Sequence, residues 1–223
     1  MFEAAGSMLP AALGIALSPF PVIGIVLVLI SPNGRTKGVA FTAGWLASLS
    51  LLTAVVLLAF EQIQDSDGSR TAVDWVRVVV GVALLLAAGR KWRTRPRRGA
   101  QAELPAWMSR VSELSVRRAA RMGALLGGVN PKNVVFTIAA GSSIAELVDD
   151  GVNEIAAAAL FVGLSSITVV GATALQLFAG NRGGGALTAV GDFMVRYANA
   201  ITMVMFVALG GMILGDGIAG LTA

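Results

Sequence analysis

The sequence predicts an all-α polytopic membrane protein of six transmembrane helices, arranged as two inverted repeats of three helices each (3+3). Hydrophobic residues make up 56% of the 223 residues, and charged residues only 13%. The apolar residues gather in blocks, several of which reach the roughly 20 residues that a helix needs to cross a bilayer. A transmembrane β-barrel would instead show short segments of alternating polarity. Prolines at matching depths in the first and fourth blocks predict that these two helices are broken.

The first three blocks form the expected first repeat, residues 1–89. We expect them to span about residues 8–30, 38–60 and 75–89. Ser18-Pro19-Phe20-Pro21 stands in the middle of the first block, where two prolines predict a local unwinding. Ser18 offers a hydroxyl to the backbone groups that this unwinding frees. Arg77 lies near the start of the short third block, and we expect its side chain to reach the lipid headgroups.

A polar connection, residues 90–121, separates the repeats and holds ten of the seventeen basic side chains. Four of these follow the third block directly and are candidates for contact with lipid headgroups: Arg90, Lys91, Arg93 and Arg95. Apolar residues recur at helical spacing between Leu104 and Leu114. Two interpretations of this segment stay open. It is either an amphipathic helix lying on anionic headgroups or a solvated linker whose charges only set the topology.

The second repeat, residues 122–223, is expected to span about residues 122–147, 153–179 and 193–214. Its first block contains Asn130-Pro131-Lys132-Asn133. Lys132 stands about ten residues into the block, roughly 15 Å from its start, which is near the middle of a hydrocarbon layer about 30 Å thick. A charge at that depth is costly and therefore indicates a functional site. Pro131 predicts a helix break beside it, and Asn130 and Asn133 offer hydrogen bonds to the freed backbone or to a ligand.

Two other interpretations of Lys132 stay open. The side chain could pair with a carboxylate or with carbonyl groups and only stabilise helix packing, or the span could begin later and leave Lys132 at the cytoplasmic interface. Weakly polar faces also run along the other blocks, and they suit either a transport pathway or hydrogen bonds between helices. The candidates for lining such a pathway are Thr42, Ser165, Thr168, Gln176, Asn199 and Thr202.

The charged residues predict the orientation of the chain. Arg35, Lys37 and the basic cluster in 90–121 fall on one side of the membrane, whereas the acidic loops at 61–74 and 146–154 fall on the other. The positive-inside rule then places the 90–121 loop in the cytoplasm and both termini outside. The matching prolines and three spans per half predict that the repeats insert in opposite directions, as in secondary transporters.

Several classes of function are excluded by what the chain lacks. It has no cysteine and no histidine, which excludes Cys/His metal sites, thiol redox chemistry and Ser-His-Asp hydrolysis. No paired carboxylates fall within the expected spans, so we expect no enzyme, and we expect no metal and no cofactor. Only a lysine–serine pair, Lys132 with Ser18 or Ser142, would remain for catalysis. No ring of charged residues recurs across the spans, as a channel would need. The basic residues indicate orientation rather than a nucleic-acid partner.

Four stretches of the chain form a recognisable set: Ser18-Pro-Phe-Pro-Val-Ile-Gly-Ile-Val-Leu, Ser31-Pro-Asn-Gly-Arg, Phe41-Thr-Ala-Gly-Trp45 and Gly128-Val-Asn-Pro-Lys-Asn133. Together they resemble the LysE superfamily of exporters, and most closely its peptidoglycolipid-addressing (GAP, or Sap-like sulfolipid-addressing) family. The resemblance covers the whole six-span chain. It implies an exporter in a bacterial inner (plasma) membrane that carries cell-envelope glycolipids or related amphiphiles. Export of amino acids or other small metabolites stays open, although this chain has Ser-Pro-Phe-Pro where amino-acid exporters usually show a Pro-Gly-Pro-type turn.

We therefore expect a secondary exporter or translocator that binds cargo near the midplane, at the broken helices. Lys132 would bind an anionic headgroup or a carboxylate, or carry a coupling proton. The rest of the substrate site is expected from Asn130, Pro131, Asn133, Ser18, Pro19 and Pro21. The expected partners are membrane lipids and the lipid or small-molecule cargo, and a homo-oligomer stays open. The alternative is a non-transporting membrane scaffold whose basic loop recruits a cytoplasmic partner or anionic lipid.

Overall fold

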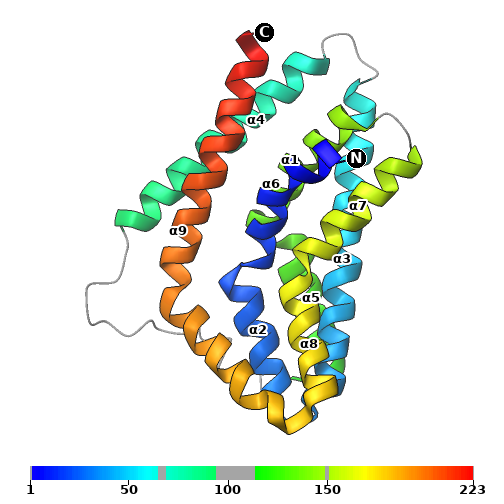
Figure 1. The fold of residues 1–223 in the computed structure, drawn as a ribbon, viewed down its shortest axis with the longest axis vertical. Helices are drawn as coiled ribbons and strands as arrows, with labels where there is room; N and C mark the ends of the chain where they lie inside the picture. The colour runs from blue at the N-terminus through cyan, green and yellow to red at the C-terminus, as the bar shows by residue number, and fades with distance from the viewer. Residues whose placement is uncertain (1, 65–68, 94–113, 149–150, 223) are drawn as a thin grey trace.

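The computed structural model describes residues 2–64, 69–93, 114–148 and 151–222, and this part of the chain is almost entirely helical, with no strand. Most of the helices run along the long axis of the molecule, and the two termini lie at the same end (Figure 1). By length and apolar composition, two of the described helices could each cross a membrane, and two bent helix pairs could add two more spans. The all-α membrane class is therefore confirmed. The six-span inverted repeat stays a prediction.

The first span is broken where its prolines predict. Helices α1 (Phe2–Ala16) and α2 (Pro19–Ile30) meet at an angle of 51°. Pro19 is the first residue of α2, where its missing N–H costs nothing, and Ser18 before it has an extended backbone. Ser18, Pro19 and Pro21 are all buried. The break at Ser18-Pro19 is confirmed.

The expected fourth span is also broken at its proline. Helix α5 (Val116–Ala124) continues into a π-helical turn, η2 (Leu125–Val129), and α6 (Pro131–Leu147) begins immediately after Asn130. Asn130 has an extended backbone and Pro131 occupies the first position of α6. The break at Asn130-Pro131 is confirmed. The helical part of this segment begins at Val116, before the expected start at Met122.

A third break, in the expected fifth span, was not predicted. Helices α7 (Gly151–Ser165) and α8 (Ile167–Ala179) meet at 61° across Ser166. No proline stands there, but serines at such a point can withdraw backbone hydrogen bonds from the helix and bend it. Beyond α8, Gly180 has a φ of +55° and leads through a short 3₁₀ turn, η3 (Gly180–Gly183), into α9 (Gly184–Thr222).

The remaining long helices are continuous. Helix α3 covers Gly34–Gln64 and α4 covers Ser69–Arg93, so Arg90, Lys91 and Arg93 form the last turn of α4. Because α5 begins at Val116, both ends of the expected 90–121 connection are helical. Arg95 and most of the expected amphipathic segment 104–114 lie outside the described residues.

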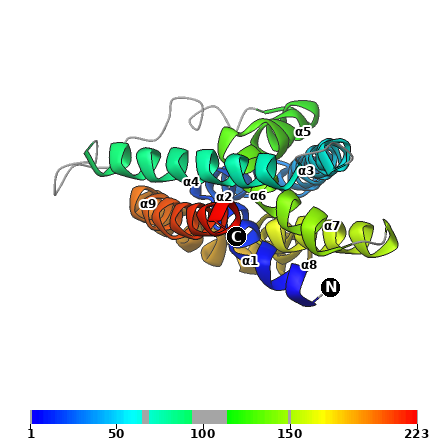
Figure 2. The same ribbon diagram turned by 90° about the horizontal axis from the view of Figure 1, so that it is seen from above.

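Two closely packed helix pairs flank the centre of the molecule. Helix α4 lies along α9 on one side, α3 lies along α5 on the other, and α1 and α6 pack together between them (Figures 1 and 2). Glycine permits the close approach of α3 and α5, because a Cβ on Gly123 would stand 2.0 Å from the carbonyl oxygen of Phe41. The aromatic core of this arrangement is fully buried and comprises Phe41, Trp45, Phe136 and Phe161.

Candidate functional site

The ammonium group of Lys132 is buried at the fourth-span break. Lys132 is the second residue of α6, and its Nζ exposes less than 1 Å² and has no hydrogen-bond partner among the described residues. It lies 5.3 Å from the ring centroid of Phe136, which stands one turn further along α6. Lys91, at the end of α4, is near enough to repel it electrostatically. A buried cation that is repelled by a second cation is costly, so this arrangement favours the binding of an anion.

The two asparagines of the break form hydrogen bonds with its backbone. Asn130 caps α6 by accepting a hydrogen bond from the backbone N–H of Lys132 at 3.1 Å. Asn133 is fully buried, and its Nδ2 donates to the carbonyls of Leu126 and Gly127, each at 2.9 Å. These carbonyls belong to the π-helical turn, and Pro131 cannot donate a hydrogen bond to them because it has no N–H. The Oδ1 of Asn133 is buried without a partner, so an acceptor remains for cargo or water.

Four helices meet around Lys132. From α4, Lys91 Nζ donates to Asn199 Oδ1 of α9 at 3.4 Å. The ring of Phe136 packs edge-on against Phe206 of α9, with centroids 6.4 Å apart. On its other side, Phe136 lies against Gly14 of α1, where an added Cβ would stand 2.6 Å from the ring. The site is therefore enclosed by α1, α4, α6 and α9.

The expected headgroup contacts occupy the end of α4. Arg90 and Arg93 are exposed there, in the same turn as Lys91. Lys91 is less exposed and also reaches α9, which links the expected headgroup contacts to the Lys132 site.

The breaks of the first and fifth spans lie side by side. Thr168, in the first turn of α8, donates to the carbonyl of Ala16 at the end of α1, at 2.6 Å. The indole of Trp45 donates to Ser166 at 3.0 Å, and the hydroxyls of Thr42 and Thr173 share a hydrogen bond of 2.8 Å. Thr42 and Thr168 therefore join helices together. Among the described residues, no hydrogen bond joins Ser18 to Lys132.

The other expected pathway residues have separate surroundings. Thr202 is buried and donates to the carbonyl of Ala198 in its own helix, at 2.8 Å. Ser165 Oγ and Gln176 Oε1 are buried and lack partners, as does Thr137 Oγ1 of α6. Buried polar atoms without partners indicate places for water or a ligand.

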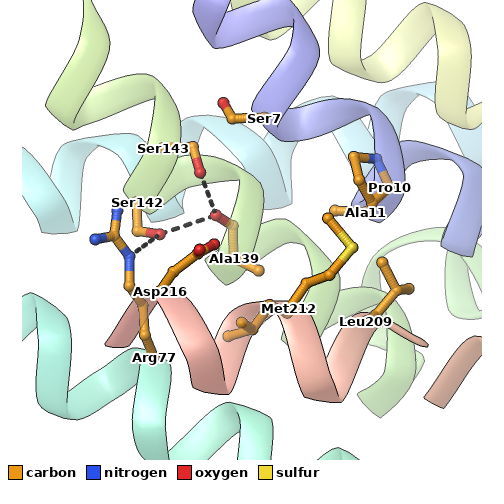
Figure 3. Close-up of a pocket in the computed structure, with 11 residues that line it drawn as sticks. Ser7, Pro10, Ala11, Arg77, Ala139, Ser142, Ser143, Leu209, Met212 and Asp216 are labelled. Atoms are coloured by element: carbon orange, nitrogen blue, oxygen red, sulfur yellow. Dashed lines mark hydrogen bonds between the residues drawn. The ribbon is translucent and has the colours of Figure 1, made fainter. Parts of the chain in front are cut away.

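A second polar cluster lies further along α6, around a pocket of about 30 Å³, which is room for about one water molecule (Figure 3). Arg77 of α4 pairs with Asp74 at 3.3 Å, hydrogen-bonds Ser142 at 3.4 Å and forms an ion pair with Glu146. Asp216 of α9 lines the same pocket. The Arg77 side chain, which was expected to reach the headgroups, is only 12% exposed and pairs with these two carboxylates, of which Glu146 is itself 58% exposed.

Three of the residues that shape these sites were not among the predicted site residues, namely Phe136, Trp45 and Ser166. Phe136 stands four residues after Lys132, which is the spacing at which side chains on a helix meet, so this contact could have been expected. Trp45 and Ser166 are far apart in the sequence, and only the fold brings them together. The adjacent serines at 165 and 166 were the available signal for the fifth-span break.

Comparison with known protein families identifies a relationship. A family model described as "Sap, sulfolipid-1-addressing protein" matches residues 8–219, nearly the whole chain. No curated protein and no solved structure matches the chain.

Proposed function

Because this chain belongs to the Sap, sulfolipid-1-addressing protein family, we propose that it is an inner-membrane secondary exporter or translocator of a cell-envelope glycolipid or related amphiphile. The family description points to a role in lipid export or addressing. The apolar helices support a membrane location for that role. The cargo would bind at the break before α6.

The observation that carries the proposal is the buried, unpartnered ammonium of Lys132. Placing a lysine at the centre of a membrane helix costs roughly 2.5–3.5 kcal/mol on insertion scales. The Phe136 ring compensates part of that cost, and an anionic headgroup would compensate more of it. Broken helices supply binding sites in transporters because they turn helix ends and unpaired backbone groups toward the cargo.

Helix packing supports the proposed 3+3 inverted repeat. Exchanging the two halves would map the first span onto the fourth, the second onto the fifth and the third onto the sixth. Under that exchange, a contact between the first and fifth spans becomes a contact between the fourth and second spans. Both contacts are present, because α1 packs on α7, and α5 and α6 pack on α3. The third and sixth spans, α4 and α9, pack on each other. Both termini lie at one end of the molecule, as an outside location for both requires (Figure 1).

A transport assay on Lys132 variants tests the function. Inside-out vesicles carrying Lys132→Met, Lys132→Arg or wild-type protein would be supplied with a labelled anionic amphiphile, and Arg121→Met, at an exposed position on α5, would serve as the control. We expect the Met variant to lose transport, the Arg variant to keep part of it and the control to match wild type. Full transport by a folded, inserted Met variant would remove Lys132 from the mechanism.

The same vesicles separate the two alternative functions. Accumulation of labelled amino acids, with no movement of the amphiphile, would indicate a small-metabolite exporter. A membrane scaffold would transport neither compound. Replacing Arg90 and Arg93 with glutamine, with topology checked, would then abolish recruitment of its partner.

A further inference from the structure

The charged side chains along α4, α6 and α9 are separated by sign. At one end of α6, Lys132 lies within electrostatic reach of Lys91, and neither forms an ion pair with a carboxylate in the described part of the chain. At the other end, Arg77 is held by Asp74 and Glu146. The helix rise places Ser142, beside Arg77, roughly 15 Å from Lys132 along α6. Asp74 and Glu146 therefore do not neutralise the two lysines.

The present contacts of the two lysines are weak and replaceable. Lys132 faces the neutral ring of Phe136, and Lys91 donates to the neutral amide of Asn199 at 3.4 Å, which is long for a hydrogen bond. Both contacts leave ammonium hydrogens without an anionic acceptor. A tetrahedral or planar oxyanion carries several acceptor oxygens on one centre and could accept from both ammonium groups together.

We propose that Lys91 and Lys132 together bind the oxyanion headgroup of the cargo, with Asn199 holding Lys91 in place when no cargo is bound. This rests on the proposed function and names its substrate class: an amphiphile whose headgroup is a sulfate ester, a phosphate ester or a carboxylate. A neutral or cationic headgroup would leave the repulsion between the two lysines uncompensated. Exposed apolar side chains on the same helices, at Val82, Leu86, Val204 and Val207, let the tails remain in the membrane.

The arrangement also assigns different roles to the two lysines. Lys132 is the buried, fixed charge on α6, whereas Lys91 stands at the end of α4 and can move between Asn199 and the headgroup. Lys91 is therefore a binding residue that would meet the headgroup as it enters from the side of the Arg90–Arg93 turn.

Binding measurements on the full-length protein test this. Purified protein in nanodiscs of neutral phosphatidylcholine would be titrated with fluorescent dodecyl phosphate, dodecyl sulfate and laurate, and with a dodecyl trimethylammonium analogue. The variants are Lys91→Met, Lys91→Arg, Lys132→Met and Asn199→Leu, with Arg121→Met as the matched exposed control. We expect each Lys→Met change to weaken binding of the oxyanion probes by about tenfold or more, since charge-assisted hydrogen bonds are lost.

The other arms make the inference specific. Lys91→Arg should bind the oxyanion probes with most of the wild-type affinity, and Asn199→Leu should bind them as tightly as wild type or more tightly. Binding of the trimethylammonium probe should not depend on either lysine. Competition by millimolar inorganic sulfate or phosphate would show that the site takes the free anion, and its absence would show that the tail is needed. Oxyanion affinity in Lys91→Met that equals the Arg121→Met control would overturn the role of Lys91. If Lys132→Met still lost transport in that case, the proposed function would stand and only this inference would fail.

Discussion

Replacing Arg77 with methionine distinguishes an inward ion pair from a side chain that reaches the membrane surface. Arg77 Nη1 lies 3.3 Å from Asp74 Oδ1, and the two side chains are 12% and 10% exposed. At that separation, an effective dielectric constant of about 20 gives a gross attraction of about 5 kcal/mol. Much of this is offset by desolvation, and the measured effect of removing one partner from a buried pair is about 3–5 kcal/mol, because the other charge is stranded.

The expected loss of stability comes mainly from Asp74. The second carboxylate, Glu146, is 58% exposed, so its ion pair is worth only about 0–1 kcal/mol. We therefore expect Arg77→Met to cost about 3–5 kcal/mol, which lowers the melting temperature by roughly 10 °C for a chain of this size. Glu146→Gln should lower it by no more than about 2–4 °C. Arg77→Met combined with Asp74→Asn should recover most of the loss, since no buried charge is then left alone.

The assay is thermal unfolding of purified protein in a mild detergent, followed by tryptophan fluorescence at one fixed scan rate. An arginine that reached the headgroups would tolerate methionine with almost no change, because exposed positions contribute little. A melting temperature for Arg77→Met within about 2 °C of wild type would refute the inward ion pair. A double variant no more stable than the single one would show that Asp74 is not the stranded charge.

Two further predictions concern helix packing and the break before α6. Gly123→Val should destabilise the protein by at least about 1–3 kcal/mol, because the new Cβ would collide with the Phe41 carbonyl. Gly89→Val is the control and should cost no more than about 1 kcal/mol, because nothing lies within 4 Å of its Cβ position. Thermal unfolding of both variants checks this prediction, and equal stability would contradict the close approach of α3 and α5. Asn133→Leu should cost about 1–3 kcal/mol in the same assay, because the carbonyls of Leu126 and Gly127 lose their donor, and an unchanged melting temperature would show that these carbonyls find another partner.

Proline made two of the three breaks predictable from sequence. It acts through its own backbone, which lacks an N–H and crowds the preceding turn, so breaks at Pro19 and Pro131 could be expected, although Pro10 lies inside α1 without ending it. The fifth-span break at Ser166 depends instead on hydrogen bonds that come from other helices, such as the one from Trp45, and a local pattern does not contain them. The amphipathic segment expected near 104–114 lies mostly outside the described residues and stays a prediction.

For the charged residues too, the sequence indicated burial but not the contacts made with other helices. The depth of Lys132 in its apolar block suggested a buried charge, and its Nζ is buried. Partners that stand on other helices could not be predicted from a local pattern. Arg77 finds Asp74, three residues away, but also Glu146 on α6, and Lys91 finds Asn199 on α9. Membership of the wider LysE superfamily, the cytoplasmic location of the 90–121 connection and the role of each site residue stay predictions.

Photo-crosslinking of a bound headgroup tests the central claim most directly. A dodecyl phosphate with a photoreactive group beside the phosphate would be bound to the full-length protein in nanodiscs, illuminated, and its attachment site mapped by mass spectrometry. Binding at the Lys132 site predicts crosslinks to the start of α6 between Pro131 and Phe136 and to the last turn of α4 around Lys91, both lost in Lys132→Met. Crosslinks confined to exposed, lipid-facing side chains such as Val79 or Leu86, and unchanged in that variant, would contradict it.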